Sequence, residues 1–173
     1  MPKFSFFYDY ECPYCKKGWE DLKALLPSYG GMEIDWRPIE AHPRPESCRP
    51  HTDLCVQAFY VAKELGADMD AFNKSLFLAV SIERQDVEKE EVLGEILHGI
   101  VDSKAFFEIL NSGKYASMVA ENNDLAYEKN GVWFVPALRA DGPEGALRLD
   151  AKGGVGVSRK EIVDFLEKVN KNR

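Results

Sequence analysis

The sequence predicts an α/β fold in which the two halves of one sheet are separated by a block of helices. Three observations support this prediction: a strand–helix–strand pattern fills residues 3–38, only helical signals occur from Thr52 to about Gly131, and a hairpin followed by a helix ends the chain. Strand, helix and strand in succession favour a right-handed parallel unit. We therefore expect a βαβ unit, a helical block and a ββα unit, in that order.

The first unit begins with a short, aromatic-rich strand at residues 3–8. A helix is predicted for residues 13–26, because Trp19, Leu22 and Leu25 recur at the three-to-four spacing of one buried helix face. Pro27 and the glycine pair at residues 30–31 end this helix. Residues 32–38 alternate apolar and polar side chains, which indicates a strand with one covered face.

Capping and stop residues divide the rest of the chain. We expect helices to begin at Thr52-Asp53, at Asp68 or Asp70, at Asp86, at Ser103 and at about Tyr115. Extended runs at Val132–Ala140 and Ala146–Leu149 flank a Gly/Pro turn and predict a hairpin. Ser158 and Glu161 have the spacing of a capping box, which predicts the start of a last amphipathic helix.

The composition is that of an ordinary globular protein, with 45% hydrophobic and 29% charged residues among 173. The net charge of −7 and the lack of a basic block argue against a nucleic-acid or acidic-membrane partner. No apolar run approaches the roughly 20 residues that a membrane helix needs. The chain starts Met1-Pro2-Lys3 and enters its first strand at once, so we expect no signal peptide and a cytoplasmic protein. There, a paired cysteine motif is more often catalytic or metal-binding than structural.

The run Cys12-Pro13-Tyr14-Cys15 lies between the first strand and the first helix, and the other elements are organised around it. Unpaired backbone N–H groups and the positive end of the helix dipole stabilise a thiolate at such a helix start. Cys12 should be exposed at the tip, and Cys15, one turn further on, should be shielded. A thiol in this position can have a pKa of roughly 3.5–7.5 instead of about 8.5. The pattern therefore predicts that Cys12 is a nucleophile.

Other interpretations of the cysteines remain open at this stage. Zinc needs four ligands. Further candidate ligands lie together in the loop and helix start after residue 38, namely His42, Cys48, His51 and Cys55. Cys48 and Cys55 could instead pair as a disulfide or serve as an auxiliary redox pair. Cys55 falls on the apolar face of its helix, so its expected role is that of a small buried hydrophobic residue. We expect no metal at the dithiol.

Two segments carry a resemblance to a known family, Phe7-Tyr8-Asp9-Tyr10-Glu11-Cys12-Pro13-Tyr14-Cys15-Lys16-Lys17-Gly18 and Gly131-Val132-Trp133-Phe134-Val135-Pro136. With the helical block between them, they resemble the DsbA-like thiol–disulfide oxidoreductases, including cytoplasmic members related to the FrnE group. The resemblance covers nearly the whole chain. It implies a thioredoxin-like βαβ…ββα core at residues 1–50 and 119–173, with an all-helical domain inserted at residues 51–118.

The resemblance also implies a site. Val135-Pro136 would be the family's loop with a cis-proline opposite the dithiol, where an extended substrate strand pairs with the Val135 backbone. Independently, proline cannot donate to a strand ladder, so Pro136 belongs at an edge, a strand start or a bulge. The expected substrate-binding residues are these two and the central pair of the motif, Pro13 and Tyr14.

Two positions depart from the family pattern. Many relatives have a small residue where this chain has Phe134, and an acid six residues before the first cysteine, where this chain has Phe6. The group that exchanges a proton with Cys15 is therefore not identified by the resemblance. Trp133, Phe134 and Tyr14 are either an apolar rim near the sulfurs or part of the core, and the sequence favours neither.

We expect a cytoplasmic dithiol–disulfide oxidoreductase that acts on proteins or peptides with disulfides or thiols. Cys12 would attack a substrate disulfide and Cys15 would resolve the mixed disulfide. This chemistry needs no metal, nucleotide or flavin, and glutathione or a thioredoxin system would reset the couple. One alternative is a glutathione-dependent kappa-type transferase or 2-hydroxychromene-2-carboxylate isomerase, whose members usually carry serine at the first motif position. Another is a non-catalytic redox-sensing adaptor whose helical block binds a partner.

Overall fold

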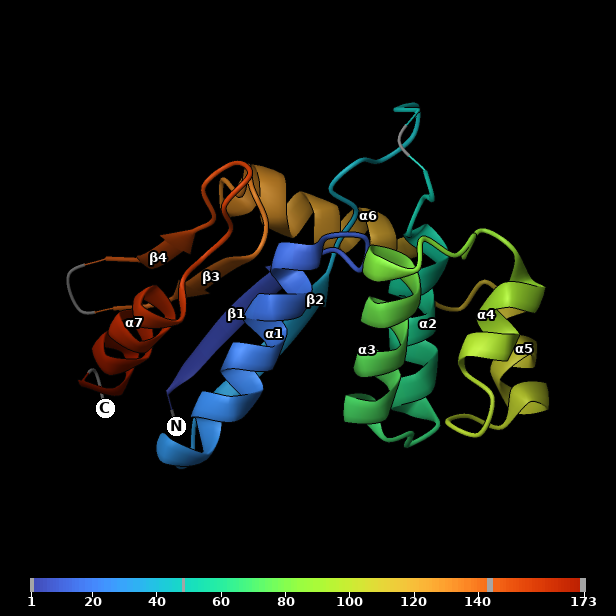
Figure 1. Ribbon diagram of the computed structural model, residues 1–173, viewed down its shortest axis with the longest axis horizontal. Helices are drawn as coiled ribbons and strands as arrows, with labels where there is room; N and C mark the ends of the chain where they lie inside the picture. The colour runs from blue at the N-terminus through green and yellow to red at the C-terminus, as the bar shows by residue number, and fades with distance from the viewer. Residues whose placement is uncertain (1, 48, 143–144, 172–173) are drawn as a thin grey trace.

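The computed structural model describes residues 2–47, 49–142 and 145–171, which form a four-stranded sheet flanked by helices (Figure 1). The strands are β1 (Lys3–Tyr8), β2 (Glu33–Pro38), β3 (Ala137–Ala140) and β4 (Leu147–Asp150), in the sheet order β2-β1-β3-β4. β1 and β2 are parallel, whereas β3 is antiparallel to both β1 and β4. The predicted parallel βαβ unit and the predicted hairpin are confirmed.

One face of the sheet is covered by α1 (Pro13–Leu25) and α7 (Arg159–Lys171), which Figure 1 shows in front of the strands. Side chains alternate along β1, and Phe4, Phe6 and Tyr8 point into the core on this face. Phe165 of α7 packs edge-on against Phe4, with ring centroids 5.7 Å apart. A short turn, η1 (Leu26–Ser28), ends α1 at the predicted proline.

The predicted capping box at the start of α7 is confirmed. The Glu161 N–H donates to Ser158 Oγ at 3.2 Å, and the Ser158 N–H donates back to the Glu161 carboxylate at 2.8 Å. The exchange satisfies backbone donors that the first turn of a helix would otherwise leave unpaired. It fixes the direction in which the chain enters α7 from the loop after β4.

The opposite face of the sheet is covered by α6 (Ser117–Asp124) and its π-helical continuation η3 (Leu125–Lys129). Phe7 of β1 and Ala137 of β3 point to this side, where they form a second, smaller core with Ala126 of η3. The buried side chain of Asn122 donates to the Pro38 carbonyl at 2.9 Å and so fastens α6 to the edge strand β2. The helix expected from about Tyr115 thus exists, although it begins at Ser117.

The inserted helices lie beside the sheet, to the right in Figure 1. They are α2 (Asp53–Glu64), α3 (Met69–Phe77) with its π-helical end η2 (Leu78–Ile82), α4 (Glu90–Ile96) and α5 (Ser103–Asn111). The prediction that Asp86 caps the third helix is wrong. Its N-cap is Lys89, because residues 86–89 form a turn, with the Lys89 N–H bonded to the Asp86 carbonyl at 3.2 Å, that buries Val87.

The inserted helices share a hydrophobic core with the sheet. The ring of Phe77, at the end of α3, lies 5.6 Å from that of Tyr8, 5.0 Å from that of Tyr10 and 5.8 Å from that of Trp19. Aromatic pairs at these separations add to the stability that burial alone provides. Because the two parts share one core, the contacts do not separate them into domains. The expected domain division, residues 1–50 with 119–173 and residues 51–118, stays a prediction.

A second difference concerns the expected strand Val132–Ala140. β3 begins only at Ala137, because Pro136 has no N–H to offer a ladder and the Val132 N–H donates instead to the Ala126 carbonyl of η3 at 2.9 Å. Residues 132–136 are therefore a loop that runs along the end of the sheet. Within the described residues no helix combines the length and apolar character needed to cross a bilayer.

Candidate active site

The turn after β1 brings Cys12 to the start of α1. The Cys12 N–H donates to the Asp9 carbonyl at 3.2 Å, which closes the turn. Cys12 has extended backbone angles, φ −91° and ψ 114°, and is the N-cap of the helix, with Pro13 in the first helical position. Proline suits that position because its missing N–H would have no partner there. Cys12 Sγ takes the place of a capping oxygen and accepts from the Cys15 N–H at 3.2 Å.

The environment of Cys12 favours its thiolate. The pKa of its thiol is lowered, chiefly by a hydrogen bond from the Cys15 side chain and further by the backbone N–H groups of Cys15 and Tyr14. Partial burial and the nearby Asp9 carboxyl act in the opposite sense. The sequence predicted an exposed Cys12 at the tip, and in the structure its side chain is partly exposed. It remains the more accessible of the two sulfurs.

Cys15 has the opposite environment. Its side chain is fully buried, and burial raises the pKa of the Cys15 thiol well above its usual range, an effect that the neighbouring Cys12 sulfur increases. A hydrogen bond from the backbone N–H of Asp9 partly offsets this. Cys12, Cys15 and Cys55 are all free thiols. The motif therefore holds one activated thiol and one protected thiol.

The loop that ends in Pro136 lies against the dithiol. The Val135–Pro136 peptide bond is cis, and the Cys12 thiol donates to the Val135 carbonyl with 3.8 Å between sulfur and oxygen. Pro136 packs on α1 at Gly18, where a Cβ atom would lie 3.2 Å from Pro136 Cγ. The two segments that carried the family resemblance in the sequence are thus in contact in the structure.

Tyr14 is held by the loop between β4 and α7. Its hydroxyl donates to the Gly154 carbonyl at 2.6 Å. Gly156 has φ +75°, and a Cβ atom there would lie only 2.8 Å from Tyr14 Cβ. Phe134 rests on the same loop, since a Cβ atom on Gly153 would lie 3.2 Å from its ring. We call residues Gly153–Gly156 the glycine strap.

Large apolar side chains are exposed around this strap. The exposed fraction is 85% for Trp133, 56% for Phe134, 69% for Val155 and 40% for Tyr14. Trp133 and Phe134 directly precede Val135, and Val155 belongs to the glycine strap. We call these four residues the apolar rim. Of the two interpretations that the sequence left open, the structure supports a rim and not a core.

Asp9 is a buried residue of the site that the sequence analysis did not single out. Its Oδ1 accepts hydrogen bonds from the Glu11 N–H at 3.1 Å and from Thr52 Oγ1 at 2.8 Å. Its Oδ2 accepts one from the Ala41 N–H at 2.7 Å. Burial, followed by the Glu11 carboxyl, raises the pKa of Asp9 to about 7, and the three hydrogen bonds limit that rise. The sequence did offer one signal for Asp9: an acidic residue at the end of an apolar strand, three positions before Cys12, is placed to be buried beside the cysteine motif.

The position at which many relatives carry an acid is apolar here in the structure as well. Phe6 is fully buried, and its ring stacks on that of Tyr8 and meets Trp36 edge-on, with centroids 5.3 and 5.6 Å away. The buried carboxyl of this site comes from Asp9 instead.

The second group of candidate ligands gives no metal site among the described residues. Cys48 lies outside those residues, so a pair with Cys55 is not described. Cys55 is fully buried on α2. His42 Nδ1 lies 2.9 Å from the Glu46 carboxylate, and the His51 ring lies 3.3 Å from the His42 carbonyl. Within residues 2–47, 49–142 and 145–171, no cluster of three or more potential ligands is placed to hold a metal ion.

Comparison with known proteins identifies the family. The family model of the DSBA-like thioredoxin domain matches residues 3–161, so the chain belongs to that family. Comparison with curated proteins gives no match. The predicted fold class, a thioredoxin-like α/β core with inserted helices, is confirmed.

Solved structures share this fold at low sequence identity. A probable DsbA oxidoreductase from Streptomyces coelicolor has a TM-score of 0.80 at 15% identity, covering 99% of this chain and 91% of that one. The cytosolic disulfide reductase DsbM from Pseudomonas aeruginosa has a TM-score of 0.69 at 16% identity, covering 95% and 97%. DsbA from the same organism has a TM-score of 0.67 at 18% identity, covering 98% and 82%. At these identities the likeness establishes the fold and not the substrate.

Proposed function

We propose that this protein is a thiol–disulfide oxidoreductase whose redox centre is the Cys12–Cys15 dithiol. The observation that carries the proposal is the asymmetry of the two thiols. Cys12 is accessible and has a lowered pKa at a helix start, whereas Cys15 is buried and has a raised pKa. A two-step exchange needs this difference, because the first thiol must attack an outside disulfide and the second must wait.

In the direction of substrate reduction, the Cys12 thiolate attacks one sulfur of a substrate disulfide. A Cys12–substrate disulfide forms, and the other substrate sulfur leaves as a thiolate. Cys15 then loses its proton and attacks Cys12 Sγ, which releases the second substrate thiolate and forms the Cys12–Cys15 disulfide. The dithiol is oxidised by two electrons and the substrate disulfide is reduced by two. The same steps in reverse oxidise a substrate dithiol.

The proposed substrate is an extended segment of a protein or peptide, held beside Cys12 by Val135 and Pro136 and flanked by Pro13 and Tyr14. Two features support this. The loop before β3 contacts Cys12 through the Val135 carbonyl, and the apolar rim next to it in the sequence and in the glycine strap has exposed side chains. Apolar surface of this kind stabilises contact with a chain that exposes apolar residues of its own.

We further propose that glutathione or a thioredoxin system returns the couple to its working state and that the protein acts in the cytoplasm. DsbM, one of the proteins that share this fold, is described as a cytosolic disulfide reductase. Reduction of the oxidised protein by glutathione, coupled to glutathione reductase and NADPH oxidation, measures the first of these proposals. A rate equal to the protein-free background would contradict glutathione as the partner.

Reduction of insulin disulfides tests the proposed function. We expect Cys12→Ser to abolish the reaction, because a hydroxyl is almost entirely protonated at neutral pH and is a poor nucleophile toward sulfur. Cys55→Ala is the matched control, since it removes a buried thiol outside the dithiol motif and should retain activity. Full activity of Cys12→Ser would remove Cys12 as the nucleophile.

A further inference from the structure

Asp9 connects three segments that are far apart in the sequence. Its carboxyl accepts from the Glu11 N–H of the dithiol turn at 3.1 Å, from the Ala41 N–H of the proline-rich loop at 2.7 Å and from Thr52 Oγ1 at 2.8 Å. Thr52 is the N-cap residue of α2, the first inserted helix. Three donors on one buried carboxyl make its position well determined. The turn that carries Cys12 is thereby tied to the entrance of the helical block.

The backbone of Asp9 takes part in the same arrangement. Its carbonyl accepts from the Cys12 N–H at 3.2 Å. Its backbone N–H acts on the Cys15 thiol in the direction that lowers the pKa of that thiol. One residue thus contacts the dithiol turn through its main chain, and through its side chain it contacts the loop before the inserted block and the N-cap of the first inserted helix.

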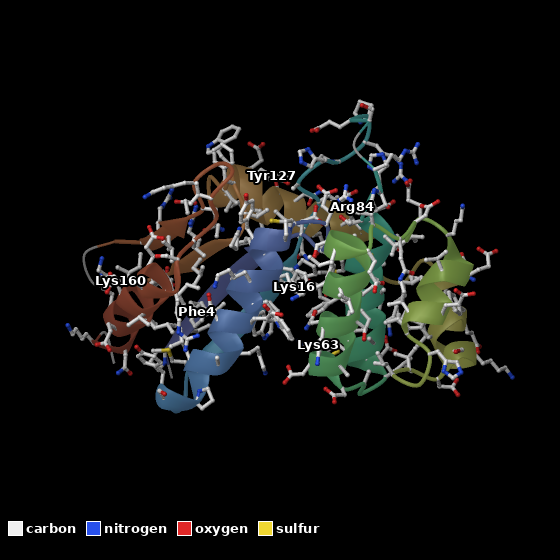
Figure 2. All side chains as sticks on the ribbon, in the orientation of Figure 1. Phe4, Lys16, Lys63, Arg84, Tyr127 and Lys160 are labelled. Atoms are coloured by element: carbon white, nitrogen blue, oxygen red, sulfur yellow. The ribbon has the colours of Figure 1, made fainter. Side chains whose placement is uncertain are left out.

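The Asp9 carboxyl interacts electrostatically with titratable groups from every segment around it. Tyr127 of η3, labelled in Figure 2, is one of them. The others are Glu11 of the turn, Cys12 and Cys15 of the dithiol, His42 of the proline-rich loop and Cys55 of α2. A buried charge is screened little by solvent, so it acts strongly on such neighbours. A negative carboxylate disfavours a negative thiolate nearby.

We propose that Asp9 is a positioning residue of the dithiol, which fixes the turn that presents Cys12 and whose charge restrains thiolate formation at both sulfurs. The proposal rests on the dithiol function proposed above. It places the control of sulfur acidity at residue 9, in a chain whose residue 6 is apolar. Loss of the negative charge at Asp9 should make Cys12 more reactive and not less.

The pH profile of Cys12 alkylation by iodoacetamide tests this. It is measured in a Cys15→Ala background by mass spectrometry of the peptide that contains Cys12, so that Cys48 and Cys55 do not contribute. Two interacting groups titrate in coupled steps. With Asp9 present, we expect a broad curve with an additional inflection near the Asp9 pKa of about 7. In Asp9→Asn the inflection should disappear. Alkylation at pH 8, where the parent Asp9 is ionised, should be about 3–10-fold faster, because the Cys12 pKa is no longer raised by a neighbouring negative charge.

Thr52→Val sharpens the test because it removes one donor to the Asp9 carboxyl and leaves the charge in place. A carboxylate that loses a hydrogen bond has a higher pKa, so the inflection should move to higher pH. Asp21→Asn is the matched control: Asp21 is a buried carboxyl of α1 that pairs with Lys17 and Arg159, and its loss should leave the profile unchanged. Circular dichroism of each variant reports whether it is folded.

The outcomes separate this proposal from the proposed function. Alkylation profiles of Asp9→Asn and Thr52→Val that coincide with that of the parent would overturn the role of Asp9 and leave Cys12 as the nucleophile. If Asp9→Asn does not fold, Thr52→Val alone decides by its inflection. Cys12 that alkylates no faster than a free peptide thiol, with insulin reduction intact in Cys12→Ser, would overturn the proposed function instead.

Discussion

The two sides of Cys12 differ in almost every physical respect. Toward the glycine strap and residues 133–134 the surroundings are apolar and open to solvent, with Trp133 the most exposed of the four rim residues. Toward Asp9 and Thr52 they are polar and buried, and three donors form hydrogen bonds with the Asp9 carboxyl. Under the function and the role of Asp9 proposed above, the open side would contact the substrate and the closed side would control how readily the Cys12 sulfur ionises.

The largest expected effect comes from removing the buried thiol. In Cys15→Ala the mixed disulfide has no neighbouring thiol to resolve it, and only thiols from solution can do so. Because an oriented intramolecular group acts at a very high effective concentration, turnover should fall by more than about 100-fold. Mass spectrometry should then find substrates held on Cys12. Unchanged turnover with no captured substrate would contradict resolution by Cys15.

The closed side should also leave its mark on stability. The folded-state pKa of Asp9 is about 7, against 3.8 for an ordinary aspartate. The fold therefore favours the protonated, neutral form of Asp9. Its contribution to the free energy of unfolding is fully present below pH 3.8 and is lost as the pH rises to about 7. At about 1.4 kcal/mol for each pKa unit, this loss is at most about 4 kcal/mol. Urea unfolding of reduced wild type should show it between pH 4.5 and 7.5, whereas Asp9→Asn should not. Parallel stability curves for the two proteins would refute it.

The glycine strap is tested by a matched pair of substitutions. Gly154 and Gly156 have nearly equal backbone angles, φ +74° and +75°, but an added Cβ meets nothing at Gly154 and comes within 2.8 Å of Tyr14 at Gly156. In both alanine variants the free energy of unfolding should fall by about 1–2 kcal/mol, because alanine is strained in the left-handed backbone conformation. In Gly156→Ala it should fall by about 1 kcal/mol more, because the added Cβ collides with Tyr14, and the rate of Cys12 alkylation should change. Equal losses in thermal unfolding, with equal alkylation, would mean that the strap does not position Tyr14.

The smallest expected effect belongs to the open side. Trp133→Ser should leave stability within about 0.5 kcal/mol, because the side chain is largely in solvent. Its KM for an unfolded protein substrate should rise about 3–10-fold, as for loss of an aromatic contact at an interface. Hydroxyethyl disulfide, too small to reach the rim, should be reduced as before. Leu78→Ser, at an exposed apolar position on η2, is the control. A KM that rises equally in both variants would contradict a specific role for Trp133.

Local patterns were sufficient to predict much of the fold and the sulfur pair. The dithiol lies at a helix start because a strand, a cysteine and a proline follow one another, and the capping box at Ser158 depends only on residues within one turn. Asp86 failed as a cap because a burial requirement at Val87, which no local pattern indicates, makes the chain turn first. The loop before Pro136 was expected as a strand because no local pattern shows where its hydrogen-bond partners lie. The Val132 N–H donates to the Ala126 carbonyl of η3 instead of to a neighbouring strand.

The features that the sequence did not reveal depend on contacts between distant segments. Asp9 receives donors from Ala41 and Thr52, and nothing near residue 9 shows that they converge there. Trp133 and Phe134 are residue types that are usually found in the core, yet both are exposed, and the Phe134 ring lies against Gly153 of the glycine strap. Their position next to Val135 was predictable, but the direction of their side chains was not.

The order of strands in the sheet has a consequence for biosynthesis. β1 lies between β2, which leaves the ribosome soon after it, and β3, which emerges only after all the inserted helices. The nascent chain therefore carries both sulfurs of its motif long before the Val135 carbonyl can cover one of them. Such late pairing slows the completion of a sheet. During that interval a reducing environment or a chaperone would protect the growing polypeptide from premature cross-linking.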